Sequence, residues 1–271
     1  MKTILLATDF SKTADSASWH AAQLSAILNT RLVLVHVYQQ SINLLSFESS
    51  FTLTEKNKVS SLRKLYRLRD RLQKAYNGRL SIAVIAKKGS TLETINEIAM
   101  EQKADLIIMG TMGEKSPGAR YFGSQATEMI LKTFFPLLLV PPKTTVTPFK
   151  NIVVAIDLSK HVDALVLDDV LLFAEQLKAT LNIVCMSETP QDLKVQKAGE
   201  HIRHLMLNYP HTLTIVKGYD LIATLNGFEK QSEADLLIIM PRPHNKLIFS
   251  VLETASQEIA RQSQIPVLAI V

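Results

Sequence analysis

The chain has 271 residues, enough for one large domain or two of ordinary size. Hydrophobic residues make up 47%, charged residues make up 20% and the formal net charge is +5, which indicates a soluble globular protein and excludes a disordered chain. No apolar run reaches the roughly 18 residues of a membrane-spanning helix, and the N-terminal run is too short for a signal peptide, so we expect a cytoplasmic protein. The single cysteine, Cys185, excludes a disulfide within the chain and is expected to be buried.

Strand-like and helix-like segments alternate along the first half of the chain. Short apolar runs predict strands at residues 4–10, 31–37, 81–87, 104–110 and 136–141. Apolar residues at helical spacing predict the helices between them: one from an N-cap at Ser11 to Leu28, one over 54–76, one that starts at a Ser90–Glu93 capping box, and one over 124–134. This alternation favours β-α-β units.

The second half repeats the alternation. Strands are expected at 151–156, 180–186, 212–217, 235–240 and 266–271, with helices over 161–178, 192–208, 220–231 and 251–262. Three stretches also match by sequence: residues 2–12 match 150–160, residues 104–109 match 234–239, and residues 135–140 match 265–270. The first pair is 148 residues apart and the other two are 130 apart, so the second copy is 18 residues shorter after its second strand.

A segment rich in Pro and Thr, residues 141–149, separates the copies and is predicted to be a linker, with a boundary near residue 146. We therefore expect domains at residues 1–144 and 149–271. Near-continuous apolar strands indicate sheets buried on both faces, which predicts α/β domains with doubly wound parallel sheets of the Rossmann-like type. Ligands of such sheets bind outside the carboxyl ends of the strands. In the first copy these ends are residues 7–9, residues 36–37 and the segment from Gly110 onward.

Four of the nine glycines lie within residues 110–123, directly between an expected strand and an expected helix. Glycine lets a backbone approach a ligand closely, and free N–H groups at a helix N-terminus attract anions, so a phosphate is one interpretation. A simple turn between strand and helix is the other, and the glycines alone do not decide between them. The segment is neither a Walker P-loop nor a dinucleotide-binding loop, because both of those spacings are absent.

The residues do resemble a known family, the tandem universal stress proteins. The opening ILLATDFS, the second-strand LVLVHV and above all the spacing G-x2-G-x9-G-S carry the resemblance, and the last of these is the ATP-binding signature of that family. The resemblance covers both halves of the chain outside the linker. It implies two tandem domains of the adenine nucleotide alpha hydrolase-like fold, with ATP and Mg²⁺ bound by the first.

The resemblance also implies a role for each matching position. The adenine and ribose end of the pocket would be lined by Ala7, Thr8, Asp9 and Val37. The ribose and first phosphate would be wrapped by Met109, Gly110, Met112 and Gly113. The remaining phosphates and the magnesium ion would be held by Gly123, Ser124, Gln125 and Thr127. His36 is expected to pack behind this pocket as a strand residue, not to act as a catalyst.

The second copy has the same length over this region but lacks the glycines. Met240, Pro243, Glu253 and Thr254 stand where the first copy has Gly110, Gly113, Gly123 and Ser124. Proline removes a backbone donor, and a glutamate at the helix N-terminus would repel phosphate. We therefore expect a degenerate second domain that does not bind ATP. The family resemblance implies that it pairs with the first domain through the fifth strands, as an internal pseudo-dimer, and a homodimer of chains is a further expectation.

Three functions remain open on the sequence. The first is an ATP-binding stress-response regulator, the second an enzyme that hydrolyses ATP slowly or handles adenylates, and the third a nucleotide-free scaffold. No nucleophile–base arrangement or metal-ligand cluster supports an enzyme, and we expect no dedicated catalytic residue.

A basic stripe is predicted on the helix over 54–76, formed by Arg63, Arg67, Arg71 and Lys74. Such a stripe is either a solvated helix face or a surface for an acidic partner or nucleic acid. Nucleic acid is disfavoured because no aromatic stacking platform or recognised nucleic-acid motif accompanies it.

Overall fold

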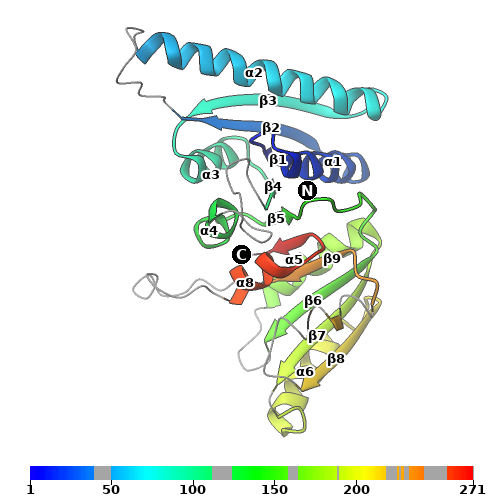
Figure 1. Cartoon of the computed structure of the whole chain (residues 1–271). Helices are drawn as coiled ribbons and strands as arrows, with labels where there is room; N and C mark the ends of the chain where they lie inside the picture. Colours follow the sequence, from blue (N-terminus) through cyan, green and yellow to red (C-terminus); the bar gives the residue numbers. More distant parts are fainter. Residues whose placement is uncertain are drawn as a thin grey trace. The chain divides into compact units, whose positions relative to one another are not determined.

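The apolar runs of the sequence form parallel strands in a computed structural model of the chain (Figure 1). The structure describes residues 1–39, 50–111, 124–157, 164–187, 189–217, 225, 227–228, 232–240 and 255–270. The chain consists of two compact units, Met1–Val146 and Thr147–Val271. Each unit is built from its own set of strands and helices.

The first unit contains a five-stranded sheet in the order β3-β2-β1-β4-β5. Its strands are β1 (Thr3–Ala7), β2 (Arg31–Tyr38), β3 (Ser81–Lys88), β4 (Leu106–Gly110) and β5 (Leu137–Val140). Its helices are α1 (Lys12–Leu28), α2 (Ser50–Ala75), α3 (Thr91–Glu101) and α4 (Ser124–Lys132). Neighbouring strands pair in parallel throughout this sheet. The strand order reverses its direction after β3, as in a doubly wound fold.

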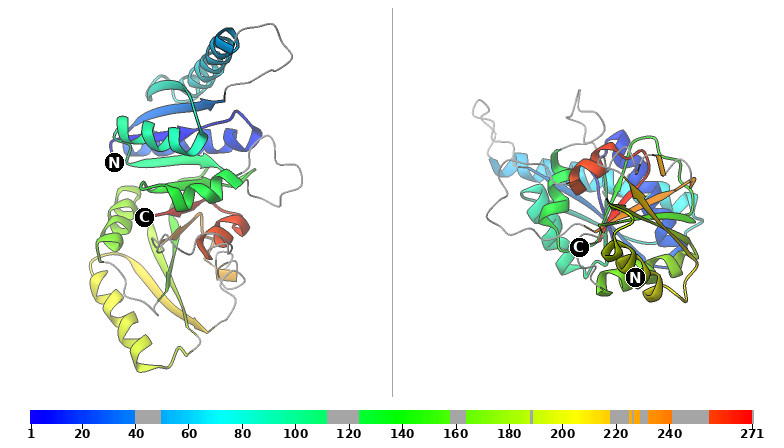
Figure 2. Two further views of the ribbon diagram at one scale, coloured as in Figure 1. Left: turned by 90° about the vertical axis from the view of Figure 1, so that its left-hand side faces the viewer. Right: turned by 90° about the horizontal axis from the view of Figure 1, so that it is seen from below.

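Right-handed crossovers determine which helices share a face of this sheet. The connections through α1 and α2 run toward β3, whereas those through α3 and α4 run back toward β5, so the two pairs cover opposite faces. Asn96 on α3 donates to the Lys132 carbonyl of α4 over 3.1 Å, and Arg71 on α2 forms an ion pair with Asp15 on α1. Figure 2 shows helices on both sides of the strands of the first unit, drawn from blue to green.

The ends of α1 follow local chemistry. Ser11 is the N-cap, and its hydroxyl oxygen accepts the Ala14 N–H over 3.1 Å, as predicted. Asn29 ends the helix in the left-handed conformation with φ 51°. The capping box predicted for α3 is wrong: Ser90 holds the N-cap position, but its side chain makes no capping hydrogen bond.

The second unit has the strand order β8-β7-β6-β9-β10, which corresponds strand for strand to the order β3-β2-β1-β4-β5 of the first unit. These strands are β6 (Asn151–Asp157), β7 (Thr180–Ser187), β8 (His211–Lys217), β9 (Leu236–Ile239) and β10 (Val267–Ala269). Its described helices are α5 (Ala164–Leu177), α6 (Leu193–Leu205) and α8 (Ala255–Gln262). The helix expected at 220–231 lies mostly outside the described residues. All strand pairings described in this unit are parallel, so the predicted α/β fold class is confirmed.

The amino-terminal edges of the two sheets are built from the same hydrogen bonds. Asp105 precedes β4, and its Oδ2 accepts the backbone N–H groups of Lys2 and Thr3 over 2.6 and 2.8 Å. Asp235 precedes β9, and its carboxylate accepts the N–H groups of Lys150 and Asn151 over 2.7 and 3.2 Å. Each aspartate joins the start of the first strand of its unit to the start of the fourth.

Both sheets are apolar where they are buried. Every residue of β1, β5 and β9 is buried, as expected for strands covered on both faces. Cys185 is fully buried in β7, in agreement with the prediction. Among the helices that the structure describes, none combines the length and the apolar character needed to cross a membrane.

Candidate functional site

The carboxyl ends of β1, β2 and β4 meet in the middle of the first sheet. Ala7, the last residue of β1, pairs with Val35 on one side and with Met109 on the other. Val37 lies two residues beyond Val35 on β2, and Gly110 follows Met109 at the end of β4. The register therefore brings together three of the stretches predicted to form a binding site.

Burial divides these residues into an apolar floor and a more accessible rim. Ala7 and Met109 are 7% and 8% exposed. Val37 and Gly110 are half-buried, and Asp9 is exposed. A ligand at this edge could rest on apolar side chains and meet the Asp9 carboxylate at the rim.

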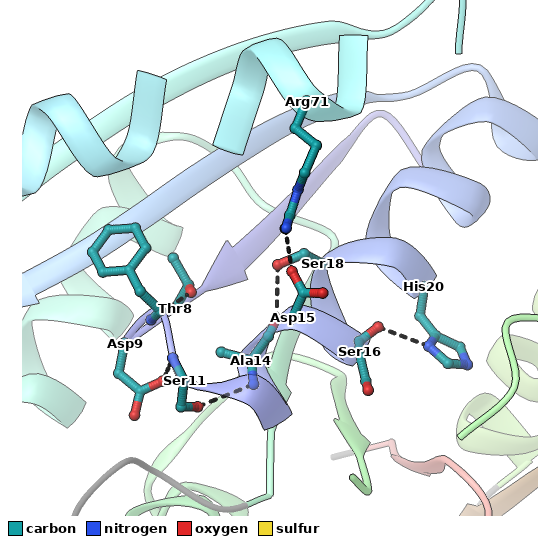
Figure 3. A network of polar contacts seen from close by, with 10 residues as sticks. Thr8, Asp9, Ser11, Ala14, Asp15, Ser16, Ser18, His20 and Arg71 are labelled. Atoms are coloured by element: carbon teal, nitrogen blue, oxygen red, sulfur yellow. Dashed lines mark hydrogen bonds and ion pairs between the residues drawn. The ribbon is translucent and has the colours of Figure 1, made fainter. Parts of the chain in front are cut away.

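The turn from β1 to α1 is fixed by short-range hydrogen bonds (Figure 3). Thr8 Oγ1 accepts the Phe10 N–H over 3.0 Å, and Asp9 Oδ1 accepts the Ser11 N–H over 3.0 Å. These two bonds hold Phe10 at φ 64°, a left-handed conformation that is uncommon for a residue with a side chain. The Asp9 carboxylate points away from α2. The turn therefore presents its carboxylate away from the α1–α2 side.

Thr8 has its backbone groups engaged within the protein. Its N–H donates to the Val35 carbonyl over 2.9 Å, and its carbonyl accepts the Nδ1–H of His36 over 2.7 Å. The His36 ring also lies 4.6 Å, centroid to centroid, from the Phe10 ring. Thr8 and His36 thus position the turn, and the imidazole packs against the Phe10 ring.

Burial sets the protonation of His36. Desolvation lowers the pKa of this imidazole below its ordinary value, and the nearby Lys64 ammonium lowers it further. The hydrogen bond to the Thr8 carbonyl and the Asp9 carboxylate act in the opposite direction and are outweighed. The ring is therefore neutral at pH 7, with its Nδ1 proton donated to Thr8.

Gly110 is needed where β4 passes the start of α1. A Cβ atom at this position would lie 3.0 Å from the Thr13 carbonyl carbon and 3.1 Å from the Ala14 nitrogen. Those atoms belong to the α1 backbone and have little freedom to move. The close approach that a glycine permits is therefore used here for packing against α1.

Several predicted site residues have no described position. Met112, Gly113 and Gly123 lie outside the described residues, and Ser124 and Thr127 are placed only as parts of the α4 backbone. Gln125 is exposed on the first turn of α4, and its side-chain amide donates to the Thr91 hydroxyl over 3.4 Å.

Sequence reasoning missed how the β1–α1 turn packs against α2. The Arg71 guanidinium pairs with Asp15 across 56 positions of the chain and lies 5.4 Å from the centre of the Trp19 ring. Lys64 lies 5.3 Å from the centre of the Phe10 ring. Helical periodicity placed Arg71 in the predicted basic stripe but left Lys64 out of it, and it could not show which residues either cation faces.

No group of three or more His, Cys, Asp or Glu residues able to hold a metal ion occurs in the described part of the chain.

Comparison with known proteins shows which family the first unit matches. The model of the universal stress protein family matches residues 1–141, just over half of the chain. The chain belongs to the universal stress protein family. A curated universal stress protein of Thermus aquaticus is 32% identical over 140 residues, which are 51% of this chain and 98% of that protein.

Solved structures of similar fold extend over the whole chain. A universal stress protein from Archaeoglobus fulgidus has a TM-score of 0.75 at 14% identity and covers 98% of this chain and 95% of its own. A protein described as a universal stress protein from Pseudomonas aeruginosa has a TM-score of 0.67 at 13% identity, covering 100% and 93%. At these identities the likeness concerns the fold.

Proposed function

We propose that the chain is an ATP-binding regulatory protein of this family, with one nucleotide site in the first unit. The observation that carries the proposal is the convergence of three strand ends, at Ala7, Val37 and Met109, beside the family spacing Gly110-x2-Gly113-x9-Gly123-Ser124. Carboxyl ends of parallel strands are where ligands of such sheets bind. The residues fit an adenine nucleotide: an apolar floor for the base, an exposed carboxylate for the ribose and a helix N-terminus for phosphate.

Each group of residues has a proposed task. Ala7, Val37 and Met109 exclude water from the base, and Asp9 accepts a hydrogen bond from a ribose hydroxyl. Gly113, Gly123 and the hydroxyls of Ser124 and Thr127 receive the phosphates, with Gln125 beside them and Met112 between the first two glycines. A Mg²⁺ ion bound by the phosphates would offset their charge. Thr8 supports the site by holding the turn.

Nucleotide binding is tested by isothermal titration of the full chain with Mg-ATP. Binding is expected in the wild type, and Gly123→Glu, which introduces the residue found at position 253, is expected to abolish it. Gly118→Glu is the matched control, because it adds the same charge to the same loop at a glycine outside the spacing. A wild type that binds no ATP at millimolar concentration would sink the proposal, and equal losses in the two variants would show that the phosphate site is misplaced.

We propose that the second unit is a degenerate universal stress protein domain with a structural role. The shared strand order and the matching Asp105 and Asp235 hydrogen bonds support a common origin of the two units. Pro243 and Glu253 argue against a phosphate there. A tandem pair of domains follows, with boundaries near residues 144 and 149.

Pairing of the two units through β5 and β10 is a further proposal. Each strand is an edge strand within its own unit, and an edge strand offers unpaired N–H and carbonyl groups to a partner. If the pairing is internal, β5 amides that face away from β4 are protected from hydrogen exchange in a chain that sediments as a monomer. Fast exchange of these amides would contradict internal pairing, and protection only in a dimer would favour pairing between chains.

A nucleotide-free scaffold is the second candidate. The contact between Gly110 and the α1 backbone favours it, because this glycine has a structural reason that needs no ligand. The scaffold predicts that neither Gly123→Glu nor Gly118→Glu changes any property except net charge. Slow ATP hydrolysis would accompany binding at most, since no described residue at the strand ends is placed as a general base.

A further inference from the structure

The first unit has a second candidate binding site, between α1 and α2 on one face of its sheet. A cleft of about 280 Å³ opens there beside the β1–α1 turn. From α2 it is lined by Lys64, Arg67, Leu68 and Arg71. The opposite wall comes from the turn and α1 and includes Ser11, Asp15 and Ser18. The cleft shares Thr8 with the proposed nucleotide site, but Ala7, Asp9, Val37 and Met109 do not line it.

The cleft carries an excess of positive charge. Three cations of α2 face one carboxylate, that of Asp15, which leaves a formal charge of +2. Arg71 is paired with Asp15, whereas Lys64 and Arg67 form no ion pair with any carboxylate in the described ranges. The cations stand at positions i, i+3 and i+7, which lie on one side of a helix. Two cations without a counter-charge therefore converge on one small cavity.

Two of the three cations, Arg71 and Lys64, are held in place before any ligand arrives. Arg71 is fixed between the Asp15 carboxylate and the Trp19 ring. Lys64 lies over the Phe10 ring, and Phe10 is itself fixed by its bond to Thr8 Oγ1. Preorganised cations lose less side-chain entropy on binding than free surface cations do. Thr8, which also lines the cleft, keeps its hydroxyl hydrogen for donation, because its oxygen is the acceptor in the bond to Phe10.

We propose that this cleft binds the phosphate group of a small phosphorylated molecule. Guanidinium groups match the oxygens of phosphate in two parallel hydrogen bonds, and lysine adds a point charge. The volume is near the lower limit for small-molecule pockets, about 300 Å³, so a phosphate monoester or diphosphate fits and a bulky ligand does not. The predicted basic stripe is thereby divided: Arg67 and Arg71 face the cleft, while Arg63 and Lys74 lie outside its lining.

The test measures the binding of inorganic pyrophosphate to the full chain. Calorimetry gives the affinity, and changes in the NMR chemical shifts of the α1 and α2 amides give the location. Wild-type binding is expected, and the double variant Lys64→Gln/Arg67→Gln is expected to bind at least about tenfold more weakly, since hydrogen bonds to charged groups are worth more than 1.4 kcal/mol. The matched control is Arg63→Gln/Lys74→Gln, which removes the same charge from the same helix outside the cleft. It is expected to retain wild-type affinity within about twofold at 0.15 M salt, where distant charges are screened.

Asp15→Asn provides a test in the opposite direction. It raises the formal charge of the cleft lining from +2 to +3, which outweighs the loss of one contact that fixes Arg71, so pyrophosphate is expected to bind several-fold more tightly. Equal weakening in the two double variants, or no binding at millimolar pyrophosphate, would overturn the proposal. Malonate binding as tight as pyrophosphate would overturn the choice of phosphate. Tighter binding of a ten-nucleotide single strand at the same cations would replace the small molecule with nucleic acid.

The outcome is separable from the nucleotide proposal. Gly123→Glu is expected to leave the effect of the cleft variants on pyrophosphate binding unchanged. Lys64→Gln/Arg67→Gln is expected to leave ATP affinity unchanged. Loss of both ligands in both variants would mean a single shared site and would overturn the assignment of a separate cleft.

Discussion

The amino-terminal edges of the two sheets agree closely, whereas their carboxyl edges do not. At the amino ends, Asp105 and Asp235 each bind two backbone N–H groups of the first strand. At the carboxyl ends, Gly110 of the first unit corresponds to Met240 of the second. The amino edge holds each sheet together, whereas the carboxyl edge is where ligands of parallel α/β sheets generally bind. The two aspartates therefore serve the fold, whereas the difference between Gly110 and Met240 lies at the edge where a ligand site would be.

Replacing either aspartate should give the largest effect. Asp105→Ala and Asp235→Ala each leave two strand N–H groups without a charged acceptor, and a loss of about 2 kcal/mol of unfolding free energy is expected for the affected unit. Asn at either position keeps an acceptor oxygen and should cost about half as much. Hydrogen exchange of the β1 amides measures the effect of Asp105→Ala, and hydrogen exchange of the β6 amides measures the effect of Asp235→Ala. A cost below about 0.5 kcal/mol in only one unit would break the equivalence of the two edges.

Gly110→Ala tests the carboxyl edge. The added methyl group would press on backbone atoms of Thr13 and Ala14, and because only a small shift is needed the cost is expected at the lower end of overpacking, about 1 kcal/mol. Gly199→Ala on α6 is the control, because its Cβ would meet only side-chain atoms, the flexible end of Ile215 at 3.1 Å and that of Leu213 at 3.7 Å. Alanine also favours a helix over glycine, so Gly199→Ala should be neutral within about 1 kcal/mol or stabilising. Chemical denaturation gives the unfolding free energy of both variants. Equal losses would contradict the claim that Gly110 is needed for packing against α1.

The strands were predictable because a strand covered on both faces needs a run of apolar residues, and LNIVCM and DLLII supply such runs. The Ser11 cap was predictable because a serine directly before a helical apolar pattern is a local signal for a helix N-terminus. The capping box at Ser90 failed because sequence gives residue types but not the side-chain rotamer. The pairing of Arg71 with Asp15 joins positions far apart in the chain, so no local pattern could predict it.

The candidate site was predictable in part. Spacing identified the strand ends that the register then brought together at Ala7 and Met109. It could not show that Thr8 has its backbone groups bound by Val35 and His36, because those bonds depend on the pairing of two strands. A repeated acidic residue before an apolar strand, at Asp105 and Asp235, was a visible signal whose meaning became clear only from the structure.

Acid should destabilise the first unit through the imidazoles of His36 and His20. The effect is expected to be smaller than that of the Asp105, Asp235 and Gly110 substitutions. Burial lowers the folded-state pKa of His36 and of His20, so as pH falls below about 6.5 the unfolded chain takes up protons before the folded one. The unfolding free energy is thus fully retained above that pH and decreases below it. His36→Asn keeps a donor for the Thr8 carbonyl but does not titrate, so it should flatten this decrease between pH 7 and 5. The check is the unfolding free energy of both proteins at several pH values, followed at β1 amides. An unchanged slope in His36→Asn would show that the His36 imidazole does not carry the pH dependence, and attention would pass to His20.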